Sequence, residues 1–191
     1  VRIVRKVAQY FYPQRQTQVM NEGWATFWHH RILNTMYDDG HLTDGVMIEW
    51  LTSHTNVVYQ PRVGERHYSG INPYALGFAM YTDIKRICDA PTDEDREWFP
   101  DIAGKPWLEV LDHAMRNFKD ESFVGQYLSP KLMRELRLFS ITDDENDDEL
   151  EVSAIHDDAG YRRVREALAH QYDLGSREPN IQVWNVNLRG D

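Results

Sequence analysis

The sequence predicts an α+β fold, with a mainly helical body over residues 1–136 and a small α+β annex over residues 137–191 packed on it. Apolar side chains recur at helical spacing through most of the first part. After residue 137 the period changes, and two short apolar runs and one alternating run follow. We therefore expect the annex to have the order strand, strand, helix, strand. A unit of this size needs the helical body or further chain to cover it.

Capping and helix-breaking residues set the bounds of the helices expected in the body. Pro13 ends the first helix, and the run Asp38-Asp39-Gly40 closes the second. Thr43 caps the third helix, and Asn72-Pro73 opens the fourth. The expected helices cover residues 1–12, 17–37, 44–53, 73–87, a short acidic turn after Thr92, 106–117, 120–127 and 130–136.

The annex has its own expected elements. Residues 138–141 and 150–155 are expected strands on either side of an acidic tip at residues 143–149. Residues 160–172 form an amphipathic helix, and residues 181–188 alternate apolar and polar side chains like a strand. The acidic tip lacks the glycine of an EF-hand loop, so it does not fit a calcium site.

Composition excludes several classes of function. The 191 residues are 41% hydrophobic, which is enough to bury a core and excludes a disordered chain. No apolar run reaches the roughly 18 residues that a membrane-spanning helix needs, and no signal-peptide pattern opens the sequence. Cys88 is the single cysteine, which argues against an oxidising compartment, so we expect a cytoplasmic protein. The formal net charge of −10 opposes binding to nucleic acid and to anionic membranes.

The first and last residues of the sequence indicate that it is a fragment of a longer protein. Helical spacing begins at Val1 without a capping residue before it, and the sequence does not start with Met. The last residues directly follow the strand expected at 181–188. We therefore expect this chain to be the C-terminal part of a longer protein, with most of the missing chain on the N-terminal side.

The densest group of reactive side chains is the run NEGWATFWHH, residues 21–30. Glu22 and His29 are seven residues apart and fall on nearly the same face of a helix, with Thr26 between them. One interpretation is structural: Glu22 favours the helix start and His29 is a hydrogen-bonded core residue. The other is a metal site, because carboxylate and imidazole suit zinc or another divalent ion. His54 is a third candidate ligand, or a cation at a helix C-terminus.

A second group of polar residues spans residues 67–78. It joins a polar loop to the N-terminus of an apolar helix, whose free N–H groups favour an anion or an oxyanion. Tyr68 and Tyr74 are candidate hydrogen-bond donors to a developing charge. The structural interpretation is that Gly70 permits a tight turn, Gly77 permits close helix packing, and both tyrosines lie at the edge of the core.

Eight stretches of the sequence together match a known family: NEGWATFWHH, LTSHTNVVYQP, YSGINPYALGFAMYTDIKRIC, WFPDIAG, FKDESF, LSPKLMRE, LEVSAIHDDAGYRRVREALA and EPNIQVWNV. They resemble the stage V sporulation protein R (SpoVR) family, and the resemblance covers essentially all 191 residues. It implies a role in spore cortex formation or in a stress response, with a biochemical activity that is not settled. It also implies two partners besides the rest of the same protein, a serine protein kinase and a von Willebrand A-like protein.

A shorter resemblance concerns chemistry. The run Asn21–Ala25 is similar to the N-E-G-F-A segment of gluzincin metallopeptidases, in which the glutamate is the third zinc ligand. This implies that Glu22 is a metal ligand and that Tyr68 or Tyr74 is the electrophilic donor. The H-E-x-x-H helix of those enzymes is absent, so the other ligands and the general base have to come from the missing chain.

Two hypotheses follow. In the first, the chain contains half of a metal-dependent hydrolase-like site, with Glu22, His29 and His54 as metal candidates, Tyr68 and Tyr74 as catalytic candidates, and zinc or another divalent ion bound in the full-length protein. The fragment alone is then inactive. In the second, the protein is a non-catalytic adaptor of the kinase pathway that docks through its annex.

Overall fold

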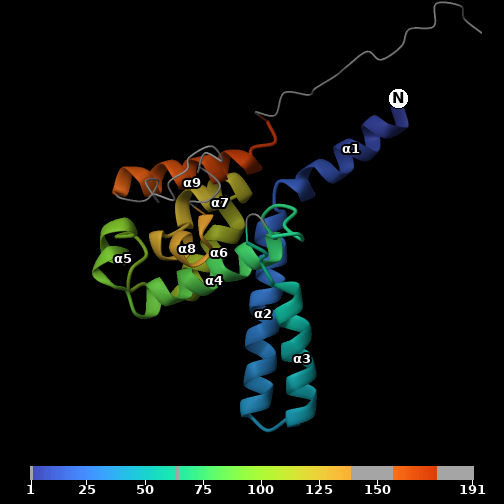
Figure 1. Cartoon of the computed structure of the whole chain (residues 1–191), viewed down its shortest axis with the longest axis vertical. Coiled ribbons are helices and arrows are strands. Elements are labelled where there is room, and N and C mark those ends of the chain that lie inside the picture. The colour runs from blue at the N-terminus through green and yellow to red at the C-terminus, as the bar shows by residue number, and fades with distance from the viewer. Residues whose placement is uncertain (1, 63–64, 139–156, 176–191) are drawn as a thin grey trace, which may run out of the picture.

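The computed structural model describes residues 2–62, 65–138 and 157–175, and in these residues the secondary structure is helical (Figure 1). The helices are α1 (Arg2–Arg15), α2 (Gln18–Asp38), α3 (Asp44–Val57), α4 (Pro73–Asp89), α5 (Asp93–Trp98), α6 (Trp107–Asn117), α7 (Asp120–Tyr127), α8 (Pro130–Glu135) and α9 (Asp158–Tyr172).

The predicted α+β class is wrong for the part of the chain that the structure describes, where helices and turns occur without a strand or sheet. The strands expected at 138–141, 150–155 and 181–188, and the acidic tip at 143–149, lie outside the described residues except for Leu138. Leu138 is 3% exposed and belongs to the helical core. A short apolar run fits a buried turn as well as a strand, and here the turn follows α8.

Most helix boundaries agree with the sequence prediction to within two residues, and two differ. Pro13 does not end α1, which continues through Arg15. A proline in the last turn removes a single helical hydrogen bond, and the chain leaves the helix directly afterwards, where the Gln16 N–H donates to the Pro13 carbonyl. The third helix runs to Val57, four residues beyond the prediction.

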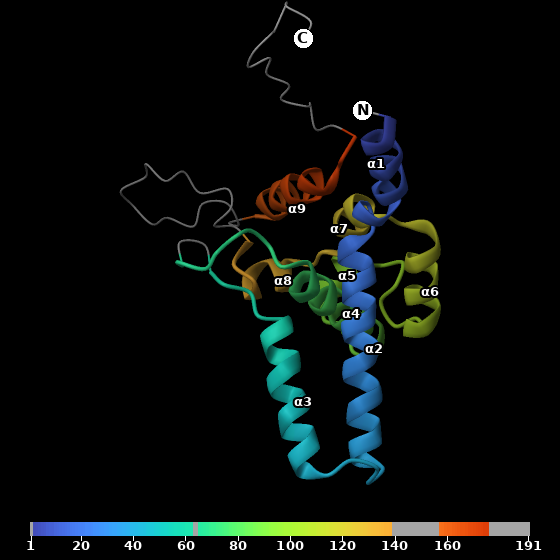
Figure 2. The same ribbon diagram turned by 90° about the vertical axis from the view of Figure 1, so that its right-hand side faces the viewer.

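The helices form a compact body from which two elements project (Figures 1 and 2). In the body, α4 packs against the first half of α2, α6 and α8, and α9 packs against α7 and α8. The second half of α2 and α3 form a helical hairpin that extends away from the body, which we call the arm (residues 31–53). At the opposite end of α2, α1 extends away from the arm.

Helices α2 and α4 approach closely at Gly23 of α2 and Gly77 of α4. A Cβ built on Gly23 would lie 2.4 Å from the Gly77 backbone, and one on Gly77 would lie 2.2 Å from the Val19 carbonyl oxygen. Both glycines are therefore required by packing and not by backbone conformation. Next to the crossing, Tyr81 packs edge-on against Trp24, with ring centroids 5.7 Å apart.

The start of α2 is held by a residue about a hundred positions away. The carboxylate of Asp120, the first residue of α7, accepts hydrogen bonds from the backbone N–H groups of Val19 and Met20, both at 2.9 Å. The Asp120 N–H in turn donates to the Gln16 carbonyl at 2.7 Å. Burial raises the pKa of Asp120 to about 6 although the N–H groups act against this. The carboxylate is thus mostly ionised at neutral pH, at the positive end of the α2 dipole.

Substitution of Gly77 by alanine tests the crossing. We expect Gly77→Ala to lower the free energy of unfolding by about 2 to 3 kcal/mol, because the new methyl group forces α2 and α4 apart. The measurement is urea denaturation followed by circular dichroism. Gly45→Ala in α3 is the matched control, since a Cβ there meets nothing within 4 Å, and it should be neutral or stabilise by up to about 1 kcal/mol. Equal effects of the two substitutions would contradict the packing role of Gly77.

Candidate functional site

The helix crossing brings Glu22 of α2 and Tyr74 of α4 together. Each residue lies a turn or less before the glycine of its own helix, so the two side chains meet beside the Gly23–Gly77 contact. The Tyr74 hydroxyl lies near the Glu22 carboxylate. The interaction with this carboxylate raises the pKa of the Tyr74 phenol above its ordinary value, with smaller contributions from burial and from the charge of Glu22. The phenol therefore keeps its proton at neutral pH and can act as a hydrogen-bond donor.

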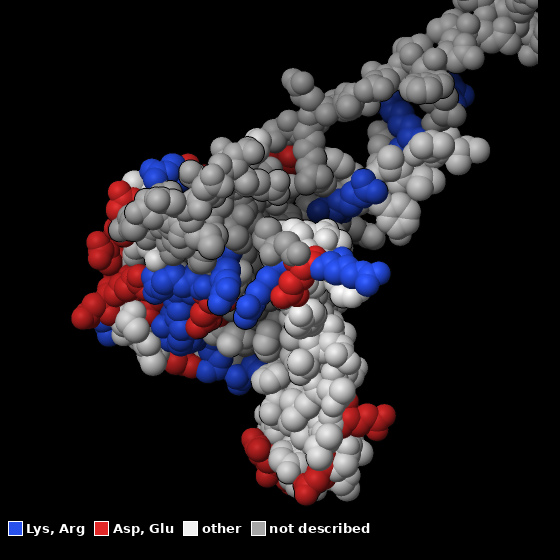
Figure 3. Space-filling view, in the orientation of Figure 1, with Lys and Arg blue, Asp and Glu red and all other residues white. Residues whose placement is uncertain are grey.

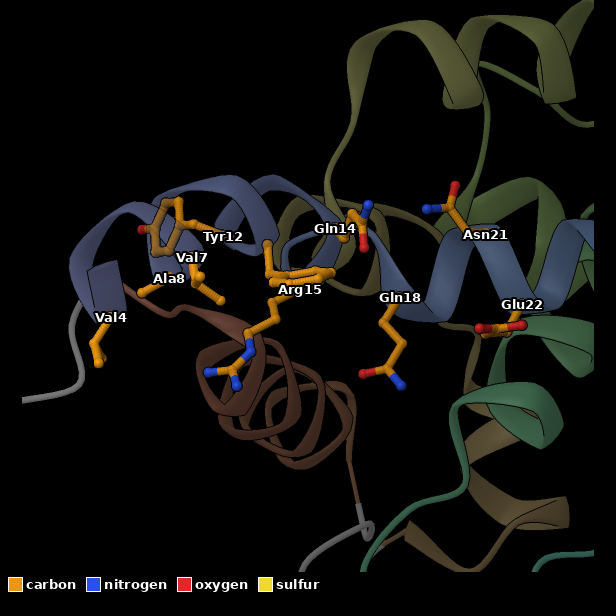
Figure 4. A pocket seen from close by; sticks show the side chains of 10 residues that line it. Val4, Val7, Ala8, Tyr12, Gln14, Arg15, Gln18, Asn21 and Glu22 are labelled. Atoms are coloured by element: carbon orange, nitrogen blue, oxygen red, sulfur yellow. The ribbon is translucent and has the colours of Figure 1, made fainter. Parts of the chain in front are cut away.

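Glu22 also forms one end of a groove with a volume of about 830 Å³. The groove runs along α1 to the start of α2, so a carboxylate terminates a largely apolar surface. In Figure 4, Arg15 and Gln18 reach toward α9, and Glu22 lies further along α2. The lining residues are Val4, Val7, Ala8, Phe11, Tyr12, Gln14, Arg15, Gln18, Asn21 and Glu22.

The N-terminus of α4, a candidate anion site, is partly occupied by its own cap. The Asn72 side-chain oxygen accepts the Tyr74 N–H at 3.0 Å. The Asn72 amide group donates to the carbonyls of Val57 and Tyr59, at 2.8 and 3.0 Å. Gln60 closes the same loop by accepting the Asn72 N–H at 2.7 Å. These bonds fix the entry into α4 and thereby the position of Tyr74.

Three histidines gather where α2, α3 and α4 meet. The His30 and His54 rings have centroids 5.1 Å apart, and Phe78 of α4 lies 5.4 and 4.9 Å from them. Trp50 packs on both rings and its Nε1–H points to His29 Nδ1 at 3.5 Å. His54 is 8% exposed, and its Nε2 atom is buried without a hydrogen-bond partner among the described residues.

Burial and neighbouring basic groups lower the pKa values of two histidines in this cluster. The pKa of His54 is lowered by burial first, and then by His30 and His29. The pKa of His30 is lowered by burial and by the adjacent Arg31 guanidinium. Both rings are therefore held neutral at physiological pH, and protonation of either one works against the packing of α3 on α2 and α4.

The structure thus separates the residues that the sequence suggested for one metal site. Seven residues of helix place Glu22 and His29 about 10 Å apart along α2, and His54 belongs to the histidine cluster. Tyr68 contributes to the raised pKa of Tyr172 in α9, after burial and Asp120. Within residues 2–62, 65–138 and 157–175 no group of three His, Cys, Asp or Glu side chains is arranged to hold a metal ion.

Sequence reasoning missed His30, Trp50 and Phe78. Trp50 and His54 are four residues apart in α3 and so share one face of that helix, a spacing that pairs them in the sequence. His30 follows directly after His29, and only the position of α3 decides which imidazole meets His54. That position is set by tertiary packing.

Comparison with known proteins agrees with the resemblance noted in the sequence. The family model described as SpoVR like protein matches residues 1–177. The chain belongs to the SpoVR family. The uncharacterized protein YcgB of Escherichia coli (strain K12) is 65% identical to this SpoVR chain over 191 residues, all of the chain and 38% of YcgB. The chain therefore spans under two fifths of that relative's length.

Two further findings concern the SpoVR chain. No solved structure matches it. Among the described residues, no helix combines the length and the apolar character that crossing a bilayer requires.

The histidine cluster predicts a pH dependence. The unfolded chain takes up a proton on His54 near pH 6.5 and the folded chain takes it up only at a lower pH, so the free energy of unfolding falls as the pH falls below about 6.5. His54→Phe keeps the ring packing and removes this loss. We therefore expect the free energy of unfolding of His54→Phe to fall less than that of the wild type between pH 7 and pH 5. Urea titrations at each pH measure this difference. His41→Phe at the exposed end of the arm is the control, and equal pH profiles for all three proteins would contradict the prediction.

Proposed function

We propose that Glu22 and Tyr74 are half of a metal-dependent hydrolase-like site that the rest of the longer protein completes. In this proposal Glu22 is a metal ligand and Tyr74 donates a hydrogen bond to charge that develops on the substrate. The observation that carries the proposal is the proximity of the Glu22 carboxylate and the Tyr74 phenol beside the Gly23–Gly77 contact, with Glu22 lining the groove. The gluzincin resemblance implies the same ligand role for Glu22, and it implies the donor role for Tyr68 or Tyr74.

The chemistry of the pair supports these roles. A carboxylate is an ordinary ligand of zinc, and catalytic zinc sites commonly use three protein ligands with one open position. A protonated phenol beside such a site stabilises an oxyanion. Both side chains are anchored on helices whose separation is fixed by Gly23 and Gly77, so their geometry does not depend on a loop.

The proposed metal site requires ligands and a general base from other parts of the longer protein. The described part of this chain supplies one carboxylate to the proposed site, and His29 and His54 lie with the histidine cluster. At least two further ligands and a general base have to come from elsewhere. YcgB, of which this chain matches 38%, is long enough to contain them. We propose that the complete protein binds zinc or another divalent ion and works in the cytoplasm, in sporulation or a stress response.

Metal analysis of the full-length protein tests the proposal. We expect about one zinc or other transition-metal ion per chain in the wild type, and a loss of most of it in Glu22→Gln, because the amide is a much poorer ligand than the carboxylate. The measurement is elemental mass spectrometry of the purified protein. Glu49→Gln, an exposed position on α3, is the matched control and should keep its metal. Wild-type protein without stoichiometric metal, or Glu22→Gln with full occupancy, would overturn the proposal.

A second candidate function is that of a non-catalytic adaptor in a serine protein kinase pathway, in which a von Willebrand A-like protein is a further partner. The supporting observation is the arm, where large apolar side chains are exposed: Ile32, Val46, Ile48 and Leu51. Figure 3 shows little charge over most of this face of the arm, and acidic side chains near its far end. The acidic tip of the annex, residues 143–149, lies outside the described residues.

Substitution on the arm tests the adaptor function. The double variant Val46→Ser/Ile48→Ser should weaken binding of the full-length protein to the kinase by about tenfold or more, since it removes two apolar side chains from the interface at about 25 cal/mol per Å² of apolar area that binding buries. Isothermal titration calorimetry measures the affinity. Leu108→Ser, a comparably exposed position on α6, is the control. An unchanged affinity in the double variant would rule out the arm as the docking surface.

A further inference from the structure

Helix α1 has no buried residue although half of its side chains are apolar or aromatic. Val4 is 71% exposed, Val7 49% and Phe11 46%. A 14-residue helix is marginal in water by its own propensity, and most helices in proteins are stabilised by packing of an apolar face. The exposed face of α1 therefore needs a partner.

The pattern of α1 indicates what kind of partner fits. Val4, Val7, Ala8 and Phe11 follow the i, i+3, i+4, i+7 spacing and form one narrow stripe, which is the spacing by which a helix packs against another helix. The same side chains line the 830 Å³ groove. The side of α1 opposite the stripe carries polar residues, while Ile3 and Tyr10 flank the stripe and are 79% and 70% exposed. The stripe and this flank together form the surface that is suited to docking.

The positive charge of α1 further limits the kind of helix that can pack on it. The 14 residues of α1 include Arg2, Arg5, Lys6 and Arg15 and no acidic residue. Two copies of α1 packed on one another would bring these cations together, which is unfavourable. A helix whose apolar stripe is flanked by acidic residues is complementary to α1. This argues for a different segment of protein and against a second copy of α1.

We propose that α1 is a docking helix for an acidic amphipathic helix from the part of the longer protein outside this sequence. More than three fifths of YcgB lies outside the region that this chain matches, so the longer protein has ample chain to supply such a helix. The groove runs from the apolar stripe to Glu22. A helix seated on α1 therefore leads its own chain toward Glu22, where further ligands are required.

The docking surface stands apart from the metal chemistry. The docking surface is inferred from the exposed face of α1 alone. Only the statement that the docked chain brings ligands to Glu22 rests on the proposed function. A protein that binds no metal can still bury α1, and a protein that binds metal can leave α1 exposed. The two proposals therefore fail independently.

Thiol labelling of the full-length protein tests the docking surface. Val7→Cys and Ala8→Cys place a thiol on the apolar stripe, and Gln9→Cys places one on the opposite side of the same helix. Each protein is treated with N-ethylmaleimide, and modification is followed by mass spectrometry of the peptide that carries the new cysteine. We expect positions 7 and 8 to react about tenfold or more slowly than position 9, because a docked helix protects them.

The comparison includes its own controls. Ala8→Cys is a small change that retains the fold if Val7→Cys does not. Reaction at positions 7 and 8 as fast as at position 9 would overturn the proposal. Protection that disappears when the protein is diluted a hundredfold would also overturn it, because the cover would then be a second copy. Slow reaction that is independent of protein concentration is the expected result.

Discussion

The contact between Gly23 and Gly77 determines the geometry on which the candidate site depends. Each glycine costs its helix about 1 kcal/mol relative to alanine, so their presence indicates that backbone proximity matters more here than helix propensity. The close approach lies among the buried side chains of Val19, Met20 and Leu76 in the core. It also sets the distance between Glu22 and Tyr74, which would be larger if α2 and α4 were separated by ordinary side chains.

A second constraint fixes α2 along its axis. Asp120 binds the first N–H groups of α2 from the start of α7, and α9 packs on α7 in turn. The first half of α2 is thereby held in the body at both its start and its crossing point, while its second half continues into the arm. One continuous helix thus connects three surfaces: the unpartnered face of α1, the Glu22–Tyr74 pair and the histidine cluster at the root of the arm.

Sequence reasoning located the helices well because caps and breakers act locally: Thr43, Asn72 and Ser129 each cap the helix that follows them. The same local reasoning identified Glu22 and Tyr74, through the spacing of residues in one helix and the character of the segment before α4. It did not show that these two residues meet while Glu22 and His29 do not, since that depends on how α2 crosses α4. The strand prediction was wrong at Leu138, because a short apolar run looks the same in a strand and in a buried turn.

In the proposed function, Glu22 belongs to a metal centre assembled from this chain and the rest of the longer protein. The decisive measurement is a crystal structure of the full-length protein with anomalous scattering recorded at the absorption edge of the bound metal. We expect an anomalous peak about 2.0 to 2.2 Å from a Glu22 carboxylate oxygen, with Tyr74 beside it and ligands from the remaining chain completing the coordination. An ordered Glu22 that pairs only with Tyr74 under a cover of protein, without a peak, would contradict it.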